Sequence, residues 1–137
     1  GAILAGPADF ISEAVRVRQM FGGGWRPAGI PAAAGIVALE GMIGRLADDH
    51  ARARALAEGL AALNGIEMDP NLVDSNIVLA RPTEAASGIV AEALIGEGVL
   101  VLPFGSFLRL VTHHEFTDAD ADITLTAFGV VLERVGR

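Results

Sequence analysis

Thirteen consecutive uncharged residues, from Pro27 to Leu39, constrain the fold of this chain more than any other feature. Residues 31–39 within this stretch are almost all small or apolar, so a helix built from them has no polar face. A helix that is apolar all round is normally buried. We therefore expect residues 31–39 to lie inside a larger body or at a subunit interface. The stretch is shorter than the roughly 20 residues that a membrane-spanning helix needs, and no membrane span is expected.

The composition supports the same expectation. The chain has 137 residues, of which 52% belong to the apolar set AVILMFWYC, and 17 more are glycine. This length is enough for one domain, or for the end of one domain and a second small one. A small domain can bury only part of this apolar surface, so we expect some of it to contact a partner. The chain begins without Met or a basic leader, so we expect it to be cut from a longer protein.

The charged residues exclude several kinds of function. All ten basic residues are arginine, so chemistry that needs a lysine amine cannot come from this chain. The formal net charge is −7 at pH 7 and there is no basic stripe, so nucleic acid is not an expected partner. The absence of cysteine excludes a disulfide scaffold, a thiolate nucleophile and a Cys-ligated metal, and it favours the reducing cytoplasm.

The first half of the chain predicts one strand and two helices. Apolar residues 2–5 predict a buried strand. Apolar residues recur every three to four positions from Phe10 to Phe21, which predicts an amphipathic helix that ends at glycines 22–24. A long helix is expected from Pro31 to Leu63, with Asn64-Gly65 as its stop signal. The ion pairs expected on its solvent side are Arg45–Asp49 and Asp48–Arg52.

Beyond Gly65 the pattern changes to short elements in the order β-α-β-β-α. This order is typical of a small α/β layer with a mostly antiparallel sheet. Thr117 and Asp120 have capping-box spacing and mark the start of the last helix. The expected strands cover residues 76–80, 99–102 and 107–112, and the expected helices run from Thr83 to Ile95 and from Thr117 through Leu132.

The distribution of charge predicts a domain boundary. Residues 1–42 carry three arginines and three acidic residues, whereas residues 43–137 carry the whole net charge of −7. A neutral apolar segment followed by an acidic module predicts the end of one domain, residues 1–42, followed by a complete small domain, residues 43–137.

Two arginines are candidate ligand-binding residues. Arg26 follows the glycine run 22–24, whose backbone N–H groups and neighbouring guanidinium could hold a phosphate. The alternative is a helix stop followed by a surface arginine. Arg109 lies in the apolar strand Phe107–Val111, where a guanidinium needs a carboxylate or phosphate partner or a path to water. It is either a ligand anchor or an edge-strand arginine.

Other polar clusters predict no metal site and no catalytic centre. His113 and His114 are expected to point to opposite faces of a strand, which makes them poor ligands for one metal ion. Asp118, Asp120 and Asp122 imitate a calcium loop, but Ile123 stands where the sixth-position glycine is required. No combination of nucleophile, acid and base closes within the chain.

Five segments of the sequence resemble the low-specificity L-threonine aldolases, and they occur in the same order. The resemblance covers essentially the whole chain, and the glycine triplet followed by Arg-Leu-Val-Thr-His is its most specific combination. The segments cover residues 18–26, 28–40, 45–50, 75–78 and 109–113.

This resemblance implies a fold and a function. The family belongs to the aspartate-aminotransferase-like, fold type I enzymes, which use pyridoxal 5'-phosphate to cleave β-hydroxy-α-amino acids into glycine and an aldehyde. It implies a Schiff-base lysine shortly before Gly1, so residues 1–42 would end the large domain and 43–137 would form the small one. Arg26 matches the family arginine that reaches the cofactor phosphate, often across a subunit boundary. Arg109 matches the family arginine that binds the substrate carboxylate. The chain is then expected to be inactive alone and to form a homo-oligomer, a dimer or tetramer, in the complete enzyme.

The sequence departs from the family at three positions. Gln19, Trp25 and Pro27 stand where family members commonly have Lys, Met and Gln. These changes beside the site leave the exact substrate open. The alternative function from a different class is a non-catalytic module for amino-acid sensing or oligomerisation, because β-α-β-β-α resembles most of an ACT domain.

Overall fold

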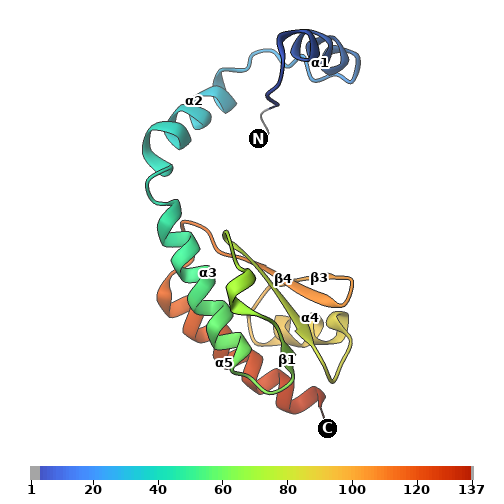
Figure 1. Ribbon diagram of the computed structural model, residues 1–137, viewed down its shortest axis with the longest axis vertical. Helices are drawn as coiled ribbons and strands as arrows, with labels where there is room; N and C mark the ends of the chain where they lie inside the picture. The colour runs from blue at the N-terminus through green and yellow to red at the C-terminus, as the bar shows by residue number, and fades with distance from the viewer. Residues whose placement is uncertain (1–3, 137) are drawn as a thin grey trace. The chain divides into compact units, whose positions relative to one another are not determined.

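The computed structural model describes residues 4–136 (Figure 1). The chain divides into two units, Gly1–Gly44 and Arg45–Arg137. Of the strand predicted at residues 2–5, residues 2 and 3 lie outside the described residues, and Leu4 and Ala5 form no strand. The assignment of residues 1–42 to the end of a larger domain stays a prediction.

The first unit contains two α-helices and a short π-helical segment. Helix α1, Ala8–Met20, confirms the predicted amphipathic helix, and Gly22 follows it with a φ of 75°. Helix α2, Gly29–Val37, carries Pro31 in its first turn, where the missing N–H has no helical partner to lose. The π-helical segment Ala38–Met42 follows directly. These elements bury none of their residues within the described chain, so the interface expected for residues 31–39 stays a prediction.

The prediction of one continuous helix from Pro31 to Leu63 is wrong. Helical structure stops after Met42, and α3 begins at Leu46 and ends at Ala61. Gly41 and Gly44 lie beside the break, and each glycine costs a helix about 1 kcal/mol relative to alanine.

No single helix of the described residues is long and apolar enough to cross a membrane. The helical segments Gly29–Met42 and Leu46–Ala61 reach that length and composition only when they are taken together.

The second unit is built on a four-stranded antiparallel sheet with the order β1-β2-β4-β3. This confirms the predicted small α/β layer with an antiparallel sheet. Its strands are β1, Ile66–Glu67; β2, Ile77–Pro82; β3, Leu102–Phe104; and β4, Phe107–Val111. Its helices are α3, α4, Ser87–Gly96, and α5, Asp118–Val135, with a 3-10 turn at Pro70–Leu72. In Figure 1, α3 and α5 lie side by side, in agreement with the contacts between them.

Alternation along the strands decides which face of the sheet is covered. Val78 and Ala80 of β2 and Leu108 and Leu110 of β4 are buried in one cluster with residues of the three helices. Phe128 of α5 is the largest side chain that is fully buried. The helices therefore cover one face of the sheet, and the residues between these buried positions point to the other face.

Two predicted boundaries differ from the structure for tertiary reasons. The strand expected at 99–102 is found at Leu102–Phe104, where Pro103 is tolerated because β3 is an edge strand. Gly105, with a φ of 60°, and Ser106 form the tight turn into β4. Thr83 does not cap α4, which begins at Ser87. Instead its N–H donates to the carbonyl of Gly65, extending the pairing of β1 with β2.

Replacing Thr117 by alanine is expected to lower the free energy of unfolding by about 1 kcal/mol. The predicted capping box is confirmed: Thr117 Oγ1 accepts from the Asp120 N–H at 3.3 Å, and Asp120 Oδ2 accepts from the Thr117 N–H at 2.8 Å. Urea denaturation measures the loss. Thr126→Ala is the control, because its hydroxyl donates only to the Asp122 carbonyl inside α5. Equal losses in both variants would contradict a capping role.

Candidate functional site

Among the nine arginines of residues 4–136, three have no carboxylate partner within that part of the chain. Among residues 4–136, six arginines form ion pairs with Asp or Glu. Arg18, Arg26 and Arg109 form none within this part of the chain. A guanidinium group is always charged and presents a donor fork that suits carboxylates and phosphates. The three arginines are therefore the groups available to bind an anionic ligand.

Arg26 lines an open hollow of about 570 Å3 at the end of α1. The glycine run folds back over the last helical turn, because the Gly22 N–H donates to the Gln19 carbonyl and the Gly23 N–H to the Arg18 carbonyl. The lining contains two guanidinium groups and no carboxylate, so an anion meets attraction without repulsion. The lining residues are Arg18, Gln19, Gly23, Gly24, Trp25, Arg26, Ala28 and Pro31.

Arg109 lies on an interior strand of the sheet, so of the two alternatives the edge-strand position is wrong. Strand β4 pairs with β2 on one side and β3 on the other, and Arg109 lies between Leu79 and Leu102. As the alternation predicts, Leu108 and Leu110 are buried and Arg109 shares the opposite face with Phe107 and Val111. We call this uncovered side the open sheet face. Its exposed apolar residues are Ile77, Leu79, Leu102, Phe104, Phe107 and Val111.

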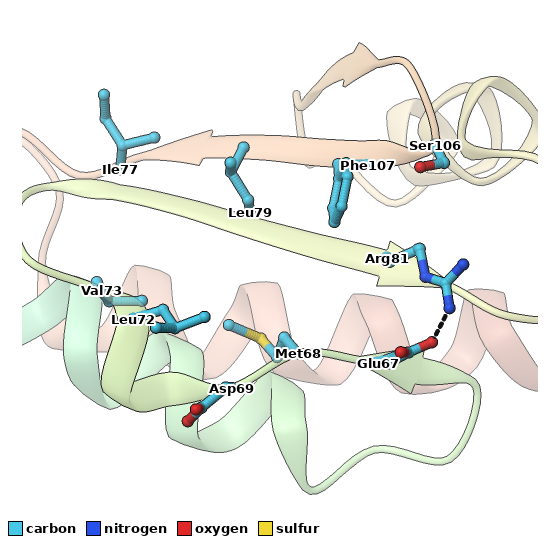
Figure 2. Close-up of a pocket in the computed structure, with 10 residues that line it drawn as sticks. All are labelled: Glu67, Met68, Asp69, Leu72, Val73, Ile77, Leu79, Arg81, Ser106 and Phe107. Carbon is cyan, nitrogen blue, oxygen red and sulfur yellow. Dashed lines mark hydrogen bonds and ion pairs between the residues drawn. The ribbon is translucent and has the colours of Figure 1, made fainter.

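A groove of about 800 Å3 runs along part of the open sheet face. Figure 2 shows Ile77, Leu79 and Arg81 in sequence along β2, with Phe107 beside them and Met68 and Leu72 on the opposite wall. Arg81 is ion-paired with Glu67 across the strand pair β1–β2. Because Leu79 is the cross-strand neighbour of Arg109 and Phe107 lies two residues before it, the charged group stands next to apolar surface. Arg109 is not among the residues that line the groove, and the lining includes the carboxylates of Glu67 and Asp69. The groove therefore offers apolar surface beside Arg109, through Leu79 and Phe107, and not an anion site of its own.

A buried polar cluster ties the end of β4 to the start of α3, and sequence reasoning missed its burial. Asp49 is only 3% exposed, and Arg45 Nη1 donates to its Oδ2 at 2.9 Å. The Thr112 hydroxyl donates to the Asp49 carbonyl at 2.7 Å, and Asn76 Nδ2 donates to the Thr112 carbonyl at 2.7 Å. Thr112 lies three residues after Arg109, so the cluster fixes the strand that carries Arg109. Three of the segments that resemble the threonine aldolases meet in this cluster: residues 45–50, 75–78 and 109–113.

The Arg45 guanidinium holds the pKa of Asp49 below its ordinary value. Its hydrogen bond is the main cause, burial acts in the opposite direction, and the charges of Arg45, Arg52 and His113 lower the pKa further. The predicted pair Arg45–Asp49 is confirmed, but its expected place on the solvent side of the helix is wrong, because Asp49 is buried. The predicted pair Asp48–Arg52 is replaced, because Arg52 Nε donates to Asp118 Oδ1 at 2.8 Å.

His113, His114 and Glu115 come closer together than strand alternation predicts. Their possible ligand atoms lie within 4.8 Å of one another, because β4 ends at Val111 and these residues belong to the turn that follows. The argument that the two histidines point apart is therefore wrong. All three side chains are exposed, and the Glu115 N–H donates to Nδ1 of His113 at 3.3 Å. The expectation that this chain holds no metal stays a prediction.

Comparisons with known proteins find relatives that cover most of the chain. The family model described as beta-eliminating lyase matches residues 1–85. The chain is 36% identical over 132 residues to a probable low-specificity L-threonine aldolase 2 of Arabidopsis thaliana, covering 93% of this chain and 37% of that protein. It is 38% identical over 113 residues to a low specificity L-threonine aldolase of Escherichia coli, covering 82% and 33%. The chain thus spans about a third of the length of the curated relatives it matches.

Proposed function

The chain belongs to the beta-eliminating lyase family, and from this premise we propose that it is the C-terminal portion of a pyridoxal-phosphate-dependent aldolase of the threonine type. The complete enzyme would cleave L-threonine, or a related β-hydroxy-α-amino acid, into glycine and an aldehyde. The observation that carries the proposal is that Arg26 and Arg109, the two positions matched by resemblance, are among the three arginines without a carboxylate partner in residues 4–136.

The residues at the end of α1 fit the phosphate group of pyridoxal phosphate. The hollow has guanidinium groups and glycine backbone in its lining and contains no carboxylate. Arg26 would hold the phosphate there, and the partner subunit of a homo-oligomer is the proposed source of the remaining contacts. When bound, the cofactor supplies an electron sink for the electron pair left by Cα–Cβ cleavage. The chain contains no lysine, so the covalent attachment of the cofactor would come from an upstream portion.

Arg109 would bind the carboxylate of the amino-acid substrate. Its fork can donate two parallel hydrogen bonds, which fix both the position and the rotation of the carboxylate. Its neighbours Leu79 and Phe107 are apolar and exposed, so the apolar part of a substrate would have surface to pack against beside the charge pair. The Asp49–Thr112–Asn76 cluster anchors the end of the strand, so Arg109 starts from a fixed backbone.

The isolated chain is expected to show no threonine cleavage and no absorption band of a lysine-bound cofactor. Co-expression with the upstream portion of a threonine aldolase, which supplies the lysine, is expected to restore both. The measurement is aldehyde release from L-threonine, together with the cofactor absorption spectrum. Threonine cleavage by the isolated chain would refute this division of roles.

A second measurement on the isolated chain distinguishes the aldolase function from the amino-acid-sensing function. Calorimetry of the isolated chain with free amino acids is expected to show no tight binding. Tight binding that Arg109→Ala abolishes would favour the ACT-like alternative. The threonine-aldolase relatives that cover most of this chain favour the enzyme over the sensor.

A further inference from the structure

The hollow at the end of α1 contains a second arginine besides Arg26. Arg18 lies in the last turn of α1 and lines the same hollow. Its guanidinium group forms no ion pair within the described residues. Arg16, two residues earlier on the same helix, is paired with Glu13 through Nε at 3.2 Å. Arg18 therefore has a guanidinium group free of any carboxylate within the described residues, whereas that of Arg16 is already paired.

The glycine run holds Arg18 and Arg26 on the same hollow. The Gly23 N–H donates to the Arg18 carbonyl at 2.7 Å. A Cβ at Gly23 would lie 2.6 Å from Cγ of Arg18, and a Cβ at Gly24 would overlap the side-chain amide of Gln19. A Cβ at Gly23 would also lie 3.0 Å from the Arg18 carbonyl oxygen, so glycine at this position lets the loop that carries Arg26 pack directly on residue 18.

We propose that Arg18 is a second cofactor-binding residue and forms, with Arg26, a two-arginine clamp for the phosphate of pyridoxal phosphate. This inference rests on the proposed function, in which Arg26 holds that phosphate. A phosphate monoester carries a charge of about −1.5 to −2 at pH 7, which one guanidinium group does not neutralise. Two donor forks match both its charge and its oxygen atoms. The lining offers no carboxylate that would compete for either arginine.

Trp25 provides a direct measurement of the clamp. It is the only tryptophan of the chain and lines the hollow, so its fluorescence reports binding. The ligands are pyridoxine 5'-phosphate and pyridoxine, which have no aldehyde and therefore do not react with amines. Each is titrated into the chain alone and into the chain co-expressed with the upstream portion of a threonine aldolase.

Arg18→Ala and Arg26→Ala are each expected to raise the Kd for pyridoxine 5'-phosphate by about tenfold or more, as expected for loss of a charge-assisted hydrogen bond. The Kd for pyridoxine is expected to stay unchanged. Arg18→Lys keeps the charge but loses the fork, so its Kd is expected to lie between those of the wild type and Arg18→Ala. Arg16→Ala is the matched control on the same helix and is expected to bind as the wild type does.

The outcomes separate this inference from the proposed function. If Arg26→Ala weakens phosphate binding and Arg18→Ala does not, the clamp is wrong and the role of Arg26 stands. If neither preparation of the wild type prefers pyridoxine 5'-phosphate to pyridoxine, both the clamp and the cofactor assignment fall. Equal weakening in Arg16→Ala would show a general charge effect and would also overturn the clamp.

Discussion

Replacing Arg109 by alanine is expected to lower kcat/KM for L-threonine by about 10²- to 10³-fold in the chain co-expressed with an upstream aldolase portion. The reason is the loss of the bidentate ion pair that we propose between Arg109 and the substrate carboxylate. Arg109 has no ion-pair partner among residues 4–136, so the variant should keep the stability of the wild type. Steady-state kinetics and a urea denaturation curve measure the two quantities.

The controls test both position and charge. Arg81→Ala removes another arginine from the open sheet face, but one already paired with Glu67, and is expected to change kcat/KM by less than about threefold. Arg109→Lys keeps the charge and loses the fork, so its activity should fall between wild type and alanine. The amide of threonine lacks the carboxylate, so the wild type and Arg109→Ala should cleave it equally poorly. An equal loss in the Arg81 and Arg109 variants would contradict carboxylate binding by Arg109.

Replacing Arg45 by methionine is expected to lower the free energy of unfolding at pH 7 by about 3 kcal/mol. The variant leaves the Asp49 carboxylate buried without the hydrogen bond that is the main cause of its lowered pKa. Burial, which raises this pKa, is then opposed only by the charges of Arg52 and His113. Urea denaturation measures the loss, and Arg54→Met, at an exposed pair with Glu58, is expected to stay within about 0.5 kcal/mol of wild type.

The pH dependence of the Arg45 variant has a definite direction. In the wild type the folded-state pKa of Asp49 is lowered, so the stabilisation is present above the unfolded pKa of about 3.9 and is lost as the pH falls through the folded value. In Arg45→Met the pKa of Asp49 rises, so protonation relieves the buried charge and the deficit shrinks as the pH falls. A deficit that is the same at pH 7 and pH 4 would contradict a buried charge as its cause.

Local features of the fold could be predicted from the sequence because short-range geometry decides them. The end of α1 at the glycine run, the capping box of Thr117 and Asp120, and the alternation around Arg109 each depend on residues a few positions apart. The break before Leu46 and the edge strand through Pro103 were missed. The break lies beside Gly41 and Gly44, a local signal that the apolar periodicity does not contain. The edge position of β3 depends on which strands pair, and the periodicity carries no signal for that.

The sequence by itself determined which residue types are available: ten arginines, no lysine, and Arg26 and Arg109 at the two positions matched by the resemblance to threonine aldolases. Only the tertiary structure decided which arginines of residues 4–136 have no ion-pair partner in this part of the chain. Arg52 pairs with Asp118, 66 residues away, rather than with its helical neighbour Asp48, and Asp49 becomes buried beneath Thr112. The physical reason is that an ion pair depends on distance in space, which folding sets, whereas a side chain's charge and donor geometry belong to the residue itself.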